Sequence, residues 1–406
     1  MDASKWSLYS WMERTQLRNR TSLLIPVFGL LLSASVPSAA FEIGSGSKAK
    51  ASYDLHETFT LAARQCVEEA GGHEPADCSG KLDWVFGQIR KAQPRDKSTE
   101  AYAARWPDDP VRMLDRNPSK IRFGVKLMKD CTKAMTRGPA IDDVGLLCSS
   151  HYGRLQFMHA QMLSSDAGGP QDPRALVIAW ASFAFDAATD HHFRQQSYCG
   201  AVKSITHPGL KQALTFRDDS WCADRTKRKG WKVATLFALR CSNPLQEVRC
   251  WQKTGEPGDD LARMAARGAL LHLIQDSFSQ AHVARVGPGD TVPRARGPFV
   301  ARIMCQRPTA WYDYNVQNLL IPDDEGHIVP DAHGVADHPP EGGTIMIDPA
   351  CRSAQRLVDD PVTASARALW FIDRVQRARS EGATEQSIGA IRHQFIDYLE
   401  TRVFPA

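Results

Sequence analysis

The amino-acid sequence predicts an all-α protein, a bundle of many helices. Apolar residues recur at the spacing of one helical face over long segments, whereas the alternation typical of half-buried strands is scarce. The chain has 406 residues, of which 43% are apolar and 24% charged, a composition typical of a globular protein with a sizeable core. Together these features favour packed helices over packed sheets.

Helical spacing is clearest in Asp259–Arg285, where aliphatic and small residues form one apolar face. The same pattern predicts further helices at Ser52–Glu69, Ile121–Met135, Val144–Leu163, Ala175–Ala188, Val362–Arg379 and Glu385–Arg402. Turn-forming residues predict loops at Glu100–Pro118, Gly287–Pro298 and Pro322–Gly343. Because no linker divides residues 41–406, we expect a single domain with insertions.

Residues 1–40 have the three parts of a secretory signal peptide. Three arginines form a basic region, an apolar stretch runs from Leu23 to Val36, and small residues follow up to Ala40. We therefore expect cleavage after Ala40 and export, either to the periplasm or to the medium. The alternative is an uncleaved anchor, although the apolar stretch is short for a membrane span.

Ten cysteines follow the expected cleavage point, and this even number suggests several disulfides in an oxidising compartment. Cys241 and Cys250 bracket a short loop and form a plausible local pair, while the sequence leaves the other pairings open. A cysteine-bound zinc site is disfavoured because no two cysteines have the C-x-x-C spacing.

The net charge argues against duplex nucleic acid as the main partner. The whole chain carries +4, and residues 1–40 hold four basic and two acidic side chains, so the remainder carries only +2. Such a chain has no strong basic field to attract a polyanion.

The strongest chemical signal is the segment H-L-I-Q-D-S-F-S-Q-A-H within Asp259–Arg285. His272 and Asp276 share one face of the predicted helix, and two ligands at that spacing can hold one metal ion. If the helix continues, His282 lies about 15 Å beyond His272 and suits a second ion, with Asp276 able to bridge the two positions. Without a metal, the same residues would be a solvated or hydrogen-bonded His–Asp pair.

The pattern H-x(3)-D-x(5)-H resembles the central metal-binding helix of zinc-dependent phospholipases C and of the related single-strand-specific nucleases. Members of this superfamily gather three zinc ions from motifs spread over a multi-helix bundle. The resemblance implies that fold, with insertions, and a phosphodiester hydrolase activity. It covers the metal-binding segments and not the sequence between them.

For the first zinc, the resemblance implies His272, Asp276, a further carboxylate and a further histidine. The tripeptide W-P-D that ends at Asp108 is similar to the W-x-D of the nucleases and points to Asp108, with Asp109 as the competing choice. The tripeptide S-H-Y around His151 resembles the short His-aromatic motif of the family and points to His151.

For the second zinc, the resemblance implies His282 and an H-x(3)-D motif downstream, which His333 and Asp337 match. His327 and His338 lie close enough in the sequence to compete for the same role.

For the third zinc, the resemblance implies the mature N-terminus, Asp276 and an early histidine. Phe41 is the first residue after the expected cleavage point, and His56 opens the first predicted helix. Family members begin with tryptophan, and Phe41 departs from that pattern.

Two other histidine segments are interpreted as features that bind no metal. His159 follows His151 by eight residues, on a similar face of the predicted helix, and is interpreted as a residue that packs in the core or supports a metal ligand without binding the metal. His191 and His192 are adjacent, so on a helix they point apart and serve one metal poorly; they are interpreted as surface residues or as residues that support a metal ligand.

The resemblance also implies the chemistry. Zinc held by His and Asp lowers the pKa of bound water towards about 7 and neutralises charge on phosphoryl oxygens. Whichever of Asp108 and Asp109 is not engaged with zinc would act as the general base.

We favour a phospholipase C that releases phosphorylated headgroups from glycerophospholipids, acting as a monomer in transient contact with a membrane surface. The helix motif lacks the second histidine and the proline of the nucleases, and the near-neutral charge offers no obvious channel for single strands. Two alternatives stay open. One is a single-strand nuclease or 3′-nucleotidase on the same zinc ions. The other is a non-enzymatic, disulfide-braced exported protein without a metal.

Overall fold

The computed structural model describes eleven stretches of the chain. They are residues 55–88, 100–108, 149–151, 153–162, 172–215, 232–237, 259–285, 302–314, 321–322, 328–329 and 346–406. The chain divides into two units, Met1–Val36 and Pro37–Ala406, and every described residue belongs to the second. Within these stretches, no helix is long and apolar enough to cross a membrane.

Helices make up most of the described chain, which confirms the predicted all-α class. The long helices are α1 (Leu55–Glu69), α7 (Pro173–Thr189), α15 (Asp259–Asp276), α18 (Pro361–Ser380) and α19 (Glu385–Tyr398). The shorter ones are η1 (Ser79–Lys81), α2 (Leu82–Gln88), α3 (Glu100–Ala103), η2 (Gln156–His159), α8 (His191–Gln195), α9 (Tyr198–Ser204), α10 (Pro208–Leu214), α13 (Val233–Leu236), η5 (Pro349–Arg352) and η6 (Leu399–Val403).

Four of the predicted helices are found close to their expected positions. Ser52–Glu69, Ala175–Ala188, Val362–Arg379 and Glu385–Arg402 correspond to α1, α7, α18 and α19, the last continued by the π-helical turn η6. The predicted helix at Ile121–Met135 lies outside the described residues.

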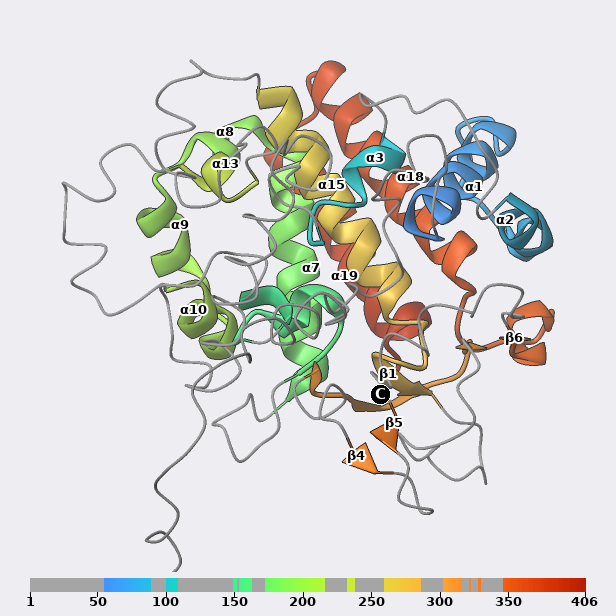
Figure 1. Ribbon diagram of the computed structural model, residues 1–406. Coiled ribbons are helices and arrows are strands. Elements are labelled where there is room, and N and C mark those ends of the chain that lie inside the picture. The colour runs from blue at the N-terminus through green and yellow to red at the C-terminus, as the bar shows by residue number, and fades with distance from the viewer. Residues whose placement is uncertain are drawn as a thin grey trace, which may run out of the picture. The chain divides into compact units, whose positions relative to one another are not determined.

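Helix α15 lies at the centre of the helices and contacts α1, α3, α7 and α18 (Figure 1). Every residue from Ala265 to Asp276 is buried. A helix buried on all sides carries its polar side chains into the interior, where each requires a hydrogen bond or a partner of opposite charge. The core position of α15 therefore decides the surroundings of His272 and Asp276.

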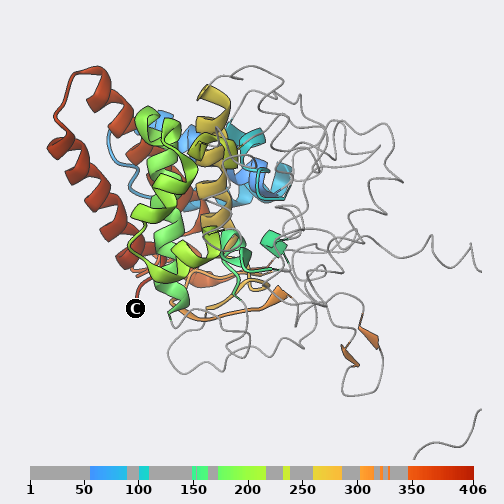
Figure 2. The same ribbon diagram turned by 90° about the vertical axis from the view of Figure 1, so that its left-hand side faces the viewer.

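The chain closes on a helical hairpin formed by α18 and α19 (Figure 2). The carboxylate of Asp360 caps α18 by accepting hydrogen bonds from two backbone N–H groups, and Pro361 occupies the first turn. The Oγ1 atom of Thr384 caps α19 by accepting one such bond, from the N–H of Ser387 (3.2 Å). These caps satisfy N–H groups that a helix leaves without partners at its start.

The strands are short and pair two by two. The pairs are β1 (Val283–Arg285) with β3 (Pro308–Trp311), antiparallel; β2 (Arg302–Ile303) with β6 (Met346–Ile347), parallel; and β4 (Ile321–Pro322) with β5 (Ile328–Val329), antiparallel.

Each cysteine within the described stretches takes part in a disulfide. Cys66, near the end of α1, is joined to Cys78, and Cys305 is joined to Cys351 of η5. These bonds are consistent with the oxidising compartment that the cysteine count suggests. The pair proposed across the Ser242–Arg249 loop lies outside the described residues.

Helix α15 ends at Asp276, so the prediction of one continuous helix over Asp259–Arg285 is wrong. The Oγ atom of Ser277 donates to a carbonyl oxygen of the last turn (2.7 Å), and the Oγ atom of Ser279 accepts from a backbone N–H group two residues later (3.2 Å). Serine side chains that bond to the nearby backbone in this way compete with helical hydrogen bonds.

A buried arginine holds the turn that follows α15. The guanidinium of Arg285 donates to the carbonyl oxygens of Ser277 (2.6 Å), Gln306 (2.8 Å) and Val403 (2.9 Å). Its burial lowers the pKa of Arg285 to about 9. Because these bonds tie β1 back to the end of α15, the chain folds over on itself just where His282 lies.

The predicted helix Val144–Leu163 is also interrupted. Residues 149–151 are helical, but the chain then turns at Gly153, whose N–H donates to the carbonyl oxygen of Ser149 (3.1 Å). A Cβ at Gly153 would lie only 2.9 Å from that oxygen, so the tight turn favours glycine. The chain continues as η2. This short helix is followed by Ala160, whose backbone lies in the left-handed region (φ 53°).

Helix α15 and α3 approach so closely that only glycine fits at position 268. A Cβ on Gly268 would lie 2.0 Å from the carbonyl oxygen of Ala103. One turn further along α15, the Nδ1–H of His272 donates to the carbonyl oxygen of Ala104 (2.8 Å). These two contacts hold the turn after α3, on which Asp108 lies.

We expect Gly268→Ala to destabilise the fold by about 1–3 kcal/mol, because the added methyl group must push α3 away from α15. Urea unfolding followed by circular dichroism measures the change. The matched control is Gly389→Ala in α19, where nothing lies within 4 Å of the new methyl group. That control should raise the free energy of unfolding by roughly 0.5–1 kcal/mol, because alanine has a higher helix propensity than glycine. Equal stability changes in the two variants would contradict the close approach.

Candidate metal centre

Seven buried histidine and aspartate side chains meet around the C-terminal part of α15. They come from α1, from the turn after α3, from the segment 149–159, from α15 itself and from the turn before β1. Each is at most 5% exposed. We call them the His/Asp cluster: His56, Asp108, His151, His159, His272, Asp276 and His282.

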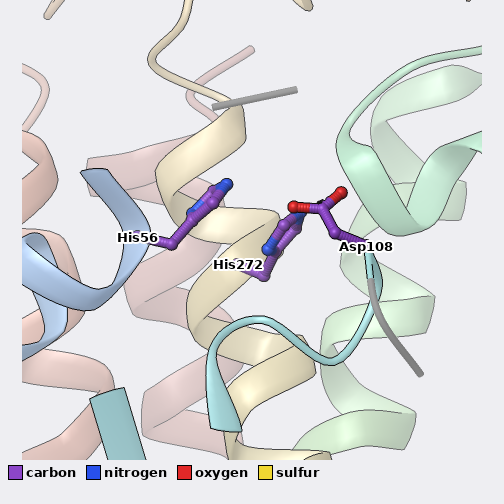
Figure 3. Close-up of side chains that lie close together, drawn as sticks. All are labelled: His56, Asp108 and His272. Carbon is purple, nitrogen blue, oxygen red and sulfur yellow. Dashed lines mark ion pairs between the residues drawn. The ribbon is translucent and has the colours of Figure 1, made fainter. Parts of the chain in front are cut away.

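Three members of the cluster, distant in the sequence, converge in Figure 3. His56 extends from α1, His272 from α15 and Asp108 from the turn after α3, and their ligand atoms lie within 4.8 Å of one another. The rings of His56 and His272 stack with their centroids 3.8 Å apart.

The carboxylate of Asp276 lies between two sets of histidines. Its Oδ1 atom lies 3.3 Å from Nε2 of His56. Its Oδ2 atom lies 3.0 Å from Nε2 of His272, 3.1 Å from Nδ1 of His159 and 3.8 Å from Nδ1 of His282. The two oxygens thus face different partners, an arrangement that suits a bridging ligand.

Asp108 is the second carboxylate of the cluster. Its Oδ1 atom lies 3.5 Å from Nε2 of His151 and 3.7 Å from both Nδ1 of His159 and Nε2 of His272. Within the described residues, neither oxygen of Asp108 accepts a well-formed hydrogen bond, and the same holds for Oδ1 of Asp276. Buried carboxylates left in this state call for a cation nearby.

Three of the histidines donate one ring N–H to an acceptor that holds the ring in place. The bonds run from His272 Nδ1 to the carbonyl oxygen of Ala104 (2.8 Å), from His282 Nδ1 to the carbonyl oxygen of His159 (2.5 Å), and from His56 Nδ1 to Oε1 of Gln275 (2.8 Å). A carbonyl oxygen can only accept, so in each neutral ring the lone pair is on Nε2. Histidines that bind metals are typically held in this way.

Gln275 orients His56 from within α15. Its Nε2 donates to Oγ of Ser365 (3.4 Å) and to Oγ1 of Thr60 (3.0 Å), so its Oε1 is turned towards His56. The Nε2 atom of His56 then faces Asp276.

The buried charged groups of the cluster shift one another's pKa values. Burial opposes ionisation of Asp276, but the surrounding histidines hold the pKa of this carboxyl well below its usual value. Burial alone would lower the pKa of His56, whereas Asp276 raises it to about 9. Burial and neighbouring His151 lower the pKa of His159 to about 3. A metal ion bound beside Asp276 can take the place of the proton on His56.

The donor set and its spacing fit zinc. Three overlapping groups could hold an ion: His56, Asp108 and His272; Asp108, His151 and His159; and His159, His272 and Asp276. Ligand atoms about 2.0–2.1 Å from a tetrahedral zinc are roughly 3.4 Å apart. The separations of 3.0–3.7 Å between ring nitrogens and the oxygens of Asp276 and Asp108 bracket that value. Nitrogen and carboxylate ligands without thiolate leave zinc a strong Lewis acid.

Several predicted ligands lie in the cluster and others lie outside the described residues. His56, Asp108, His151, His272, Asp276 and His282 meet as described above. Phe41, Asp109, His333 and Asp337 fall outside the described stretches, as do His327 and His338, so their roles stay predictions.

The expected position of His282 is wrong in one respect. It does not lie about 15 Å along a continued helix. Because α15 ends at Asp276 and the chain turns back, Nδ1 of His282 lies 3.8 Å from Oδ2 of Asp276. The shared helix face assumed for His151 and His159 is also wrong, since the turn at Gly153 separates them. Their rings instead face each other, with centroids 4.3 Å apart.

Sequence reasoning missed two participants. His159, interpreted as a residue that packs or supports a ligand, lies among the other cluster members, and Gln275 holds His56. The only signal for His159 was its place in the apolar stretch Phe157–Ala160, where a polar side chain has to be paired. For Gln275 it was a position beside Asp276 on a buried helix.

The surface interpretation of the adjacent histidines agrees with their surroundings. Both His191 and His192 are exposed, and Nδ1 of His191 lies 2.9 Å from the carboxylate of Asp259.

Comparisons with protein-family models, with curated proteins and with solved structures find no match to this chain. The assignment of a candidate metal centre therefore depends on the geometry of the described residues. They form a mostly helical structure with buried His/Asp groups able to hold metal ions.

We expect Gln275→Leu to lower the affinity for zinc by roughly 10–100-fold, because His56 loses the acceptor that orients its ring. Competition with a chelator of known affinity measures the change. The matched control is Gln394→Leu, an exposed residue of α19 that bonds to Arg374 and should leave zinc binding unchanged. Equal zinc affinity in both variants would mean that Gln275 does not support the centre.

Proposed function

We propose that this chain is an exported, zinc-dependent phosphodiester hydrolase of the phospholipase C type. The observation that carries the proposal is the His/Asp cluster, in which ring lone pairs and carboxylate oxygens face one another in a fully buried space. Such a set of acceptors is suited to several cations and poorly suited to a protein without a metal. The resemblance of H-x(3)-D-x(5)-H to the zinc-dependent superfamily supplies the reaction class.

The residues divide between three positions under this proposal. The first zinc would be held by Asp108, His151, His272 and Asp276. The second would be held by His282 with His333 and Asp337, and the third by Phe41, His56 and the shared Asp276. Zinc in these positions supplies an activated water and neutralises the negative charge of the phosphodiester.

The protein groups take distinct tasks. Asp108 is buried among histidines that lower the pKa of its carboxyl against the effect of burial, so it stays ionised and suits the role of ligand. Asp109, its neighbour in the sequence, is then the candidate general base, which accepts the proton of the attacking water. Helix α1, the turn after α3 and helix α15 hold His56, Asp108 and His272 close together before substrate arrives, and such preorganisation lowers the barrier.

A phospholipid is the favoured substrate because the chain after residue 40 is nearly neutral. A nuclease for single strands would be expected to carry a basic groove along the strand. The enzyme would then touch a membrane surface transiently and release the phosphorylated headgroup to water.

The test is an assay of purified, zinc-loaded protein on phosphatidylcholine vesicles and, in parallel, on denatured DNA. We expect release of phosphorylcholine, and Asp276→Asn should reduce that rate by at least about 100-fold, since a shared ligand is lost. Asp83→Asn is the control, because Asp83 pairs with Arg352 on the surface.

Release of nucleotides without phosphorylcholine would favour the nuclease alternative. If the protein binds zinc but cleaves neither substrate, the proposed phosphodiesterase activity is wrong, whereas the assignment of the metal centre is unaffected.

A further inference from the structure

The Nδ1 side of the His159 ring faces polar groups. Its Nδ1 atom lies 3.0 Å from Nε2 of His272, 3.1 Å from Oδ2 of Asp276 and 3.7 Å from Oδ1 of Asp108. The side chain is fully buried. A histidine that only packs would face apolar side chains, whereas this ring is directed at the two carboxylates of the cluster.

The lone pairs at the centre require something between them. His272 donates its Nδ1–H to Ala104, so its neutral ring presents a lone pair at Nε2, 3.0 Å from Nδ1 of His159. Either a proton on Nδ1 of His159 or a metal ion bound by both rings can separate these atoms.

The backbone around His159 carries a second, independent feature. Ala160 is the only non-glycine residue with positive φ among the described residues. For a residue with a Cβ this conformation costs about 1–2 kcal/mol. The left-handed conformation of Ala160 ends η2. The carbonyl oxygen of His159 then accepts a hydrogen bond from the Nδ1–H of His282, while the ring of His159 is directed at Asp276. Strain that persists in a buried turn is typical of functional sites.

We propose that His159 is a metal ligand through Nδ1 and takes the place assigned to His151 at the ion that His272 and Asp276 also bind. Its main-chain carbonyl, in addition, orients His282 for the neighbouring position. One residue thereby couples the two positions, with its ring in the first and its backbone supporting the second. The inference depends on the proposed metal centre but not on the identity of the substrate.

The sharpest variant is His159→Asn. The amide nitrogen of asparagine can occupy the place of Nδ1 and donate the same hydrogen bonds, but an amide is a poor zinc ligand. A role as hydrogen-bond donor therefore predicts normal zinc content in this variant. The ligand role predicts the loss of one zinc per chain, or at least about a 100-fold weaker affinity for it. His192→Asn, on the exposed side of α8, is the matched control.

The measurement is zinc content by elemental analysis, with chelator competition for affinity and thermal unfolding of the metal-free forms as a check on folding. We expect His159→Asn to lose zinc while its metal-free form unfolds at the wild-type temperature. Zinc present in the wild type and undiminished in His159→Asn overturns this inference alone. A wild type that binds no zinc overturns both this inference and the proposed function.

A second measurement needs no variant and covers the case in which His159→Asn fails to fold. Anomalous scattering at the zinc edge from crystals of the wild-type protein locates each ion. A zinc about 2.0–2.3 Å from Nδ1 of His159 supports the assignment. Zinc bound by His272 and Asp276 with His159 more than about 3 Å away rules it out.

Discussion

The buried carboxylate of Asp276 imposes the constraint on which the rest of this structure depends. A fully buried carboxylate is costly unless positive charge or hydrogen-bond donors compensate it. Here the nearest groups are imidazoles, two of which have the N–H turned away to Ala104 and Gln275. In its neutral form the ring of His272 thus directs a lone pair at the carboxylate, where a donor would be expected, and a metal ion between them accounts for this arrangement.

The partners of the Asp276 carboxylate are brought to it by close contacts between secondary-structure elements. Gly268 lets α3 lie against α15, which brings the turn with Asp108 to His272. Arg285 ties β1 back to the end of α15 and so returns His282 to Asp276. The site is therefore built on buried secondary structure, which holds ligands in place more precisely than exposed loops do.

Periodicity alone predicted the all-α class, helices α1, α7, α18 and α19, and the pairing of His272 with Asp276, because these features depend on local spacing. What sequence reasoning could not supply depends on tertiary contacts. Serine side chains end α15 early, a tight turn at Gly153 breaks the expected helix before η2, and only the folded chain brings His159 to the centre. Local periodicity contains no information about such long-range partners.

The most direct test of the central claim is the metal content of the purified mature protein, measured beside His272→Ala after expression in an oxidising compartment supplied with zinc. The account predicts about two or three zinc ions per chain, with fewer in the variant, since His272 contacts both carboxylates of the cluster. A folded wild-type protein without zinc would contradict it, and the buried histidines would then be a hydrogen-bonded core of a disulfide-braced protein.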